Sequence, residues 1–333
     1  MKRPIRNLTI LLAAQLLLAG GLAFARVQRG GGGGPADAPL LAFDKAAADR
    51  VVGEGPAGAK VELVKADGGW KVASRAGFPA DTARGEGLLD RLAGLRRAPP
   101  VATSAEAAAR FKVADGDFER RITVEAGGKP VATALFGTSA AMRAVHARAG
   151  GSGDVQLASF STWETPAAPD EWIDKGVLRI PRAEIEAVTV GGVTLEKAAP
   201  PAEGAAAATQ AEGGAPPAPS WRATGLPKGA SLDPAAAETL VGAVADFYIS
   251  GVADPHAASV ADTLVVAVRR AGGKTVEHRL AKPAAAGTDW TLRSSARPET
   301  LRVASYAAEA LQRAADPGTL SGKPPPPPEA PKK

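Results

Sequence analysis

The sequence predicts an α+β protein: a tandem duplication of a two-layer unit, in which an antiparallel sheet packs against one helix, preceded by one N-terminal transmembrane helix. The duplication is predicted because a tryptophan, a helix-like run and a Val-Ala pair occur twice. The same spacing separates Trp70 from Trp221 and Val101 from Val252. The copies also share the turn Ala-Gly-Gly-Lys, at residues 126–129 and 271–274. The transmembrane helix is predicted from a long N-terminal run without a charge.

The composition narrows the class of protein. A chain of 333 residues is long enough for two domains with cores of their own. It contains no cysteine, which excludes disulfides, thiolate metal sites and cysteine nucleophiles. The formal net charge is +5, with basic and acidic residues interspersed, so we expect a mixed solvated surface and no nucleic-acid partner. Aromatic residues make up only 5%, so the few large side chains must carry the core.

Residues 1–29 are expected to form a short cytoplasmic stub and a membrane anchor. Leu8 to Ala25 carries no charge and, as a helix, would span about 27 Å, close to the ~30 Å hydrocarbon core of a bilayer. We therefore expect inner-membrane lipid to contact this segment, with the basic residues before it in the cytoplasm. A cleaved signal peptide is the alternative, because Ala23-Phe24-Ala25 has the small-x-small cleavage pattern. Either interpretation exports the rest of the chain.

Composition also divides the exported part. Residues 30–39 are rich in glycine and are expected to be a flexible spacer. The first repeat is expected over residues 40–180 and the second over residues 181–315. Within the second, residues 198–219 have no apolar side chain larger than alanine, which predicts a disordered insertion. Residues 316–333 form a proline-rich tail, with a polyproline II run.

The first unit alternates apolar and polar residues in several short runs and contains one long helical run. Trp70 is expected to fill the core, because large aromatic residues are scarce in this chain. Asp81 is placed to cap an amphipathic helix over residues 80–95. The other expected elements are a hairpin of 51–52 with 60–65, a helix over 104–110 capped by Ser104, and hairpins of 121–126 with 131–136 and of 144–148 with 155–158.

Two glycine motifs resemble phosphate-binding loops, and neither fits its expected context. Gly53 to Gly58 matches G-x-G-x-x-G, but a dinucleotide site needs a helix to begin there, whereas residues 60–65 alternate like a strand. A hairpin turn is the better prediction. Gly273-Lys274-Thr275 resembles the end of a P-loop, but Val268 stands where that loop needs its first glycine. We expect no cofactor at either motif.

Five segments carry a resemblance to a known family: 61–65 before Gly69-Trp70, 88–95, 111–113, 135–138 and 170–175. Together they resemble a bacterial family, the domain of unknown function 4340, over most of residues 40–315. The resemblance implies a membrane-anchored envelope protein associated with an ABC-type export system of the kind linked to gliding motility. The family has no assigned catalytic residues, so the resemblance implies no site. Where the family usually has Leu-Phe/Tyr-Leu-Gly, this chain has Ala134-Leu135-Phe136-Gly137, and the second copy lacks the glycine at Ala281-Lys282.

Asp170, Glu171 and Asp174 form the most distinctive polar cluster. Paired carboxylates perform acid–base chemistry when burial separates their pKa values, and metal sites need three or four convergent ligands. The sequence places no histidine beside this cluster, and His146, His256 and His278 lie in different segments. We therefore expect a solvated helix start, with Asp170 as its cap and Trp172 in the core, and no catalytic or metal-binding residue.

The second unit repeats the same plan. Its elements are expected to be a hairpin of 185–190 with 193–197, a helix over 233–247, strands over 264–268, 276–280 and 290–292, and a helix over 301–315. In that last helix we expect Tyr306 and Leu311 to face inward.

Together these features predict a non-enzymatic accessory or scaffold protein. We expect it to be anchored in the bacterial inner membrane as a single-pass protein, with most of the chain in the periplasm, beside an ABC transporter permease or other envelope proteins. The alternative is a periplasmic glycan- or peptide-binding module that uses the cleft between the repeats. A hydrolase that uses Asp170, Glu171 or Asp174 ranks last, because the sequence offers no base–nucleophile set.

Overall fold

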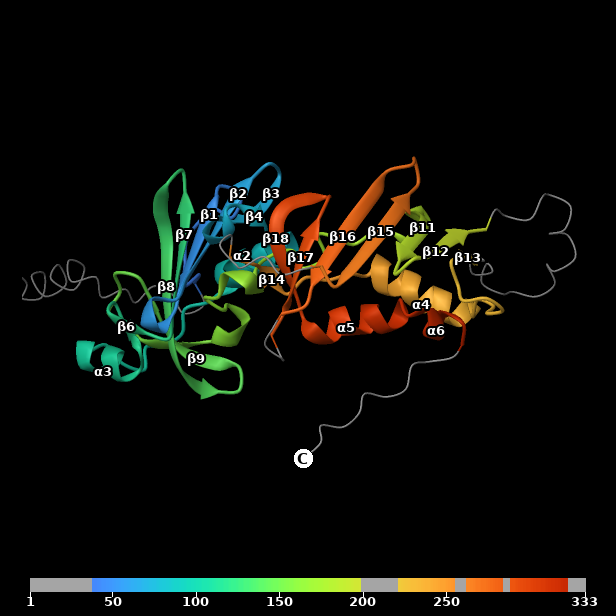
Figure 1. Cartoon of the computed structure of the whole chain (residues 1–333). Coiled ribbons are helices and arrows are strands. Elements are labelled where there is room, and N and C mark those ends of the chain that lie inside the picture. Colours follow the sequence, from blue (N-terminus) through green and yellow to red (C-terminus); the bar gives the residue numbers. More distant parts are fainter. Residues whose placement is uncertain (1–37, 199–220, 255–261, 284–287, 323–333) are drawn as a thin grey trace, which may run out of the picture. The chain divides into compact units, whose positions relative to one another are not determined.

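The computed structural model describes residues 38–198, 221–254, 262–283 and 288–322. The expected anchor, almost all of the glycine spacer, the insertion from residue 199 on and the tail from residue 323 on lie outside these ranges. The chain forms two compact units, one ending at Asp174 and the other beginning at Lys175. Both units combine antiparallel strands with a few helices, so the expected α+β class is confirmed (Figure 1).

The first unit contains one eight-stranded sheet with the order β10-β9-β8-β7-β1-β2-β3-β4, and a separate pair β5-β6. Every strand pair in it is antiparallel. Its strands are β1 Arg50–Glu54, β2 Lys60–Ala66, β3 Gly69–Val72, β4 Phe78–Pro79, β5 Val113–Ala114, β6 Asp117–Phe118, β7 Arg120–Ala126, β8 Lys129–Ala141, β9 Ala144–Ala149 and β10 Gln156–Ala158. Its helices are α2 Thr82–Gly94 and α3 Ala105–Arg110.

The second unit contains an eight-stranded antiparallel sheet with the order β13-β12-β11-β15-β16-β17-β18-β14. Its strands are β11 Ile185–Val190, β12 Val193–Lys197, β13 Trp221–Thr224, β14 Gly251–Val252, β15 Leu264–Arg270, β16 Thr275–Ala281, β17 Trp290–Ser294 and β18 Arg297–Val303. Its helices are α4 Pro234–Ala245, α5 Ser305–Ala314 and α6 Pro317–Leu320; α4 and α5 run side by side along the sheet (Figure 1).

The two sheets share a strand order. The run β3-β2-β1-β7-β8-β9-β10 corresponds to the run β13-β12-β11-β15-β16-β17-β18, strand for strand. In each unit a tryptophan at or next to the start of the third strand donates from Nε1 to a glutamate of the following helix. Trp70 donates to Glu86 and Trp221 donates to Glu238, both at 2.8 Å. Trp70 is 2% exposed, so its predicted place in the core is confirmed.

Helix α2 packs through one face. Leu88, Leu89 and Leu92 are buried at the spacing of a 3.6-residue helix, and Gly85 lies against the Trp70 ring. At about 25 cal/mol for each Å² of apolar surface removed from water, such leucines contribute roughly 2 kcal/mol each.

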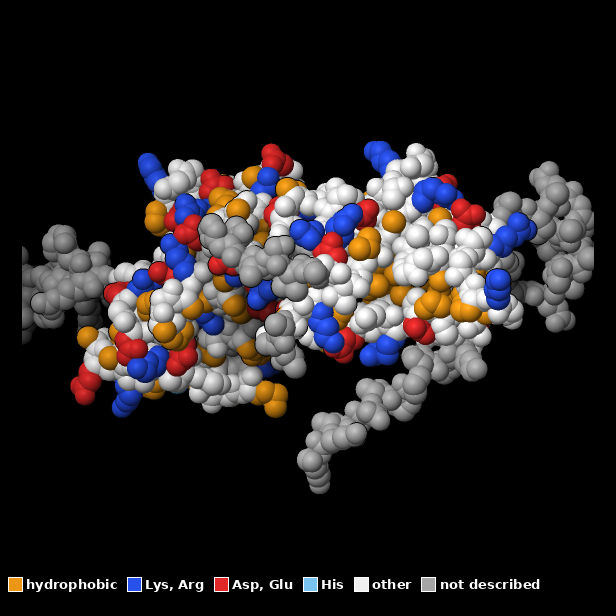
Figure 2. All heavy atoms as spheres, in the orientation of Figure 1, with side chains coloured by type: hydrophobic (Ala, Val, Ile, Leu, Met, Phe, Trp, Pro, Cys, Tyr) orange, Lys and Arg blue, Asp and Glu red, His pale blue; other side chains and the backbone are white. Residues whose placement is uncertain are grey.

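On the face of the molecule seen in Figure 2, basic and acidic side chains are interspersed.

Asp81 caps helix α2 as predicted, and Asp233 caps helix α4 in the same way. Asp81 accepts a hydrogen bond from the Arg84 backbone N–H at 3.0 Å, and Asp233 accepts one from the Ala235 N–H at 2.8 Å. Each carboxylate therefore satisfies a backbone donor that the helix leaves unpaired.

We expect Asp81→Ala and Asp233→Ala each to lower the free energy of unfolding by about 1 kcal/mol, because the cap is lost while the exposed helix start stays in place. Urea denaturation measures this. Asp81→Asn is the control, since asparagine caps as well as aspartate does. An alanine variant as stable as the asparagine variant contradicts the role of the cap.

The last predicted helix needs a correction. Residues 301–303 belong to strand β18, and α5 begins only at Ser305. Leu311 is buried as expected, but Tyr306 is 78% exposed, so its predicted inward orientation is wrong. Because the strand takes the first residues of the run, Tyr306 falls in the first turn of α5, on the solvent side.

Candidate functional site

One face of the first sheet carries a small covering segment, which we call the cap: residues 104–118, comprising α3, β5 and β6. Directly paired residues in an antiparallel sheet share a face. The pairs that run from Trp70 across the sheet therefore place Ala134 on the α2 side and its neighbour Leu135 on the opposite, outer side. The cap covers this outer side. The apolar contact is made by Ala108, Val113, Leu135 and Val155, all buried.

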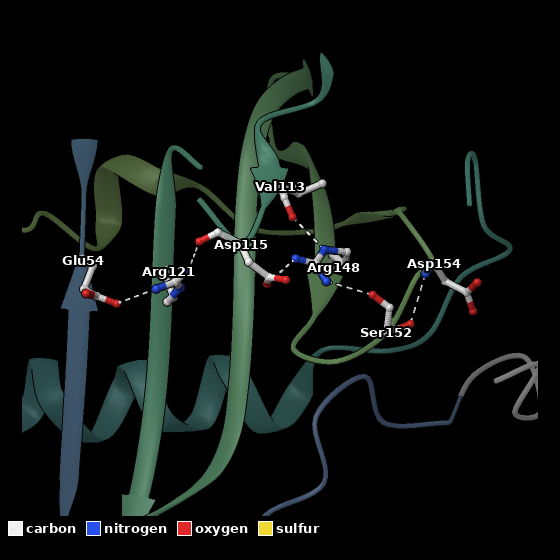
Figure 3. A network of polar contacts seen from close by, with 7 residues as sticks. All are labelled: Glu54, Val113, Asp115, Arg121, Arg148, Ser152 and Asp154. Carbon is white, nitrogen blue, oxygen red and sulfur yellow. Dashed lines mark hydrogen bonds and ion pairs between the residues drawn. The ribbon is translucent and has the colours of Figure 1, made fainter. Parts of the chain in front are cut away.

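A buried arginine attaches the cap to the sheet (Figure 3). Arg148 in β9 is 6% exposed. Its guanidinium donates from Nε to the Val113 carbonyl at 2.7 Å, from Nη1 to the Ser152 carbonyl at 2.8 Å, and from Nη2 to Asp115 Oδ1 at 2.6 Å. One side chain thus satisfies two backbone acceptors and pairs with a carboxylate, as a buried guanidinium requires.

A second arginine extends the network along the outer face (Figure 3). Arg121 in β7 donates to the Asp115 carbonyl and lies 3.4 Å from Glu54 Oε2. Its guanidinium also stacks over the Phe118 ring, with 4.4 Å to the ring centroid. The short turn at Asp115 is therefore held from both sides, by Arg148 through its carboxylate and by Arg121 through its backbone.

Gly137 explains how closely the cap approaches the sheet. The Phe111 carbonyl accepts a hydrogen bond from the Thr138 N–H at 3.0 Å. A Cβ added to Gly137 would lie 1.9 Å from that same carbonyl oxygen. Only glycine leaves room for this backbone contact, which gives a physical reason for the glycine in the segment 135–138.

The two ends of the buried ion pair differ in exposure, which leads to a prediction. The Asp115 side chain is 79% exposed, whereas Arg148 is enclosed. We expect Arg148→Met to lower the free energy of unfolding by about 2 kcal/mol, because two carbonyls lose their donor. Asp115→Ala should cost less than about 1 kcal/mol, since Arg148 keeps its two carbonyl acceptors and the lost carboxylate is exposed. Denaturant titration of both variants checks this asymmetry, and equal losses would contradict it.

Two open depressions border Asp115. One, of about 700 Å³, is lined by residues that include Arg97, Arg121 and Val131. The other, of about 260 Å³, lies beside Arg148 and the start of α3. Both mix small apolar residues with charged ones. Such a surface can hold charged or extended groups of another molecule.

The second unit has a matching arginine on its outer face. Following the cross-strand pairs from Trp221 in the same way brings Arg279 to the position of Leu135 and Arg293 to the position of Arg148. Arg293 Nη2 lies 2.7 Å from Asp262 Oδ1, and Arg279 Nη1 lies 3.3 Å from Asp262 Oδ2. The hydrogen bonds from Arg293 and Arg279 lower the pKa of Asp262 below its ordinary value. An arginine at this position is thus paired with an aspartate in both units, although Asp115 and Asp262 do not lie at equivalent positions.

The carboxylates singled out in the sequence do not cap a helix. Asp170 lies inside a 3₁₀ turn, Pro169–Glu171, whose N-cap position is Ala168, so the predicted capping role is wrong. Asp170 instead accepts from Arg75 Nε at 2.5 Å. The proline at the start of the turn already fixes its backbone. Trp172 is 1% exposed, which confirms its place in the core.

The histidines lie in separate environments. His146 stacks on the Phe111 ring at 4.0 Å between centroids, and its Nδ1 contacts the Thr138 hydroxyl at 3.0 Å. His278 is 3% exposed, and neither of its ring nitrogens has a hydrogen-bond partner in the structure. Burial lowers the pKa of His278 to about 4. His256 lies outside the described residues. Among those described, no three His, Asp or Glu side chains are grouped as metal ligands.

The glycine motifs are turns, as the alternation of their neighbours predicted. Gly53–Gly58 joins β1 to β2 through a short 3₁₀ turn, and Gly272-Gly273 joins β15 to β16. Sequence reasoning missed Arg148, Asp115, Arg279 and Arg293. Only the glycine at position 137 signalled that backbone from elsewhere would approach this strand.

Within the described ranges, no helix has the length and apolar character needed to cross a bilayer.

Comparison with known proteins identifies a family. Neither a curated protein nor a solved structure matches the chain. The model of the family described as "Domain of unknown function (DUF4340)" matches residues 70–264, from β3 of the first unit to the start of β15 in the second. This match covers more than half of the chain, which belongs to the DUF4340 family.

Proposed function

We propose that this protein is a non-enzymatic scaffold or accessory protein of the bacterial envelope. Residues 8–25 anchor it in the inner membrane, and its two units stand in the periplasm beside an ABC-type transport complex. The observation that carries the proposal is the repetition of one sheet in the two units, with half-exposed arginines on the outer face of the second. The charge-free N-terminal run supports the anchor, and the resemblance to the family supports the transport association.

We also propose that the two units arose by tandem duplication of one α+β unit. The shared strand order supports this, and so do the two Trp–Glu hydrogen bonds and the two Asp–Arg pairs. A shared strand order with two matched kinds of contact is hard to reach independently.

The pairing register corrects one detail of the sequence comparison. Aligning the copies on the shared Ala-Gly-Gly-Lys turn matches Leu135 with Leu280. By register it is Phe136 that corresponds to Leu280, because each lies on the helix side of its sheet. The shift arises at a bulge, where the pairing moves from Val124–Ala132 to Glu125–Pro130. One extra residue in β8 displaces the apparent match by one position.

The membrane topology can be tested directly because the chain has no cysteine. A single cysteine at Met142, which is 96% exposed, should react with a membrane-impermeant maleimide once the outer membrane is permeabilised. A cysteine at Asn7 should stay unlabelled until the inner membrane is broken. Labelling of both cysteines while the inner membrane is intact would contradict the anchor. Loss of residue 7 from the mature chain would establish the cleaved signal peptide instead.

The scaffold role predicts a stable partner. The full chain, solubilised from its native membrane in mild detergent, should co-purify with permease subunits of an ABC transporter. A chain without residues 1–29, exported by an unrelated signal sequence, is the control for contacts made by the anchor alone. Reproducible purification of the full chain without a membrane partner would overturn the proposed function.

A further inference from the structure

The outer faces of the two sheets are covered differently. In the first unit, Leu135 is fully buried and Arg148 is 6% exposed, because the cap lies over them. In the second unit, the side chains of Arg279 and Arg293 at the equivalent positions are 50% and 53% exposed. Val265, which pairs with Arg279 on the side away from Arg293, is 39% exposed, although most valines of this sheet are buried. Within the described residues, the outer face of the second sheet therefore carries no counterpart of the cap.

The same kind of cap cannot bind there. Gly137 gives room for the Phe111 carbonyl, and the pairing register places Ala281 at the equivalent position in the second unit. The Cβ of alanine occupies the space that the carbonyl needs. Leucine is also replaced by arginine at position 279, so an apolar cap would bury a charged group and its ion-pair partners. The occupant of this face must differ from the cap in chemistry.

The charges indicate that chemistry. In the first unit, Arg148 binds a carboxylate and two backbone carbonyls, which are all groups of a polypeptide. In the second unit, Arg279 and Arg293 share the single carboxylate of Asp262, and Glu277 also contacts Arg279. A guanidinium has five N–H donors. Two half-exposed guanidiniums on one internal aspartate and one glutamate leave donors that face solvent.

We propose that the outer face formed by Val265, Arg279 and Arg293 docks an acidic segment of a partner polypeptide. The segment takes the place that the cap takes in the first unit. Its carboxylates bind the two arginines in bidentate fashion, and an apolar side chain covers Val265. This inference rests on the proposed scaffold function and names the surface and partner chemistry through which that function acts.

The test is a titration of the purified full chain in detergent with a fluorescent hexaglutamate peptide, followed by anisotropy. We expect binding that weakens as salt rises from 0.05 to about 0.5 M, because the contact is between exposed charges. The double variant Arg279→Glu/Arg293→Glu should lose about tenfold in affinity. Arg279→Leu, which restores the residue of the first unit, should lose several-fold while it keeps the Arg293–Asp262 pair.

Arg313→Glu is the matched control, because this exposed arginine lies on α5, away from the strands β15–β17. It should bind within twofold of the wild type. Far-ultraviolet circular dichroism verifies that each variant is folded. Equal binding by the double variant and the control overturns the proposal, as does tighter binding of a single-stranded oligonucleotide of similar charge. The titration contains no permease, so its failure leaves the co-purification result standing, and the two proposals fail separately.

Discussion

Gly137→Ala is expected to detach the cap from the first sheet. The new Cβ would lie 1.9 Å from the Phe111 carbonyl oxygen and 2.6 Å from the Lys112 carbonyl oxygen. Both contacts are with backbone, so no side-chain rotation relieves them. Overpacking of this kind costs about 3 kcal/mol when the neighbours cannot move. Here the cap can move instead, and its departure exposes Leu135 and Arg148.

Two measurements distinguish these outcomes. Urea denaturation gives the loss in free energy of unfolding, and native-state hydrogen exchange reports whether the amides of residues 104–118 lose protection before the rest of the unit. Gly116→Ala is the control, because a Cβ at this glycine of the same cap meets no atom within 4 Å. It should change stability by less than about 0.5 kcal/mol. Unchanged stability and exchange in Gly137→Ala would refute the close packing described here.

Acid is expected to destabilise the second unit through His278. Burial lowers the pKa of His278 to about 4 in the folded state, from 6.5 in an unfolded chain. Between these values the unfolded state binds a proton that the folded state excludes. Stability is therefore full above pH 6.5, falls as the pH drops, and has lost about 3 kcal/mol by pH 4.

The variant His278→Leu should remove this part of the pH dependence. The ring packs 5.8 Å from Phe247 and pairs across the sheet with Val266 and Ser294, an environment that accepts leucine. Carboxylates with lowered pKa values, such as Asp262, also contribute less to the stability of the protein in acid. Both proteins share this loss, so the difference between their free energies of unfolding isolates the contribution of the histidine. The free energy of unfolding of each protein is measured from pH 7 to pH 4. As the pH falls, the wild type should lose more of it than the variant does. Parallel curves would show that His278 is not the cause.

Local signals in the sequence predicted the local structure well. Paired glycines with positive φ marked the hairpins at residues 127–128 and 272–273. Asp81 and Ser104 marked helix starts because capping needs only the next three residues. Trp70 was recognisable as a core residue because the chain has so few large aromatics.

Contacts between distant segments could not be predicted in this way. Arg148 binds Asp115 across 33 positions, and neither residue belongs to a motif. Asp170 was predicted as a helix N-cap, but it pairs with Arg75, which lies 95 positions away. The turn that contains Asp170 begins with a proline, which fixes its backbone. Tyr306 was placed on the wrong side because periodicity alone does not show where β18 ends and α5 begins. In each case the deciding contact was nonlocal.

The central ladder of each sheet also has a kinetic consequence. β1 pairs with β7, and β11 pairs with β15, whereas most other neighbours in both sheets are consecutive hairpins. Hairpins close in about 1–10 μs because their ends are near in sequence. Joining β1 to β7 requires closure of a far longer loop that contains α2. The chain entropy lost in closing this loop opposes folding before the contacts between the strands are gained. We therefore expect the two groups of consecutive strands in each unit to form first. The pairing of β1 with β7, and of β11 with β15, should form late.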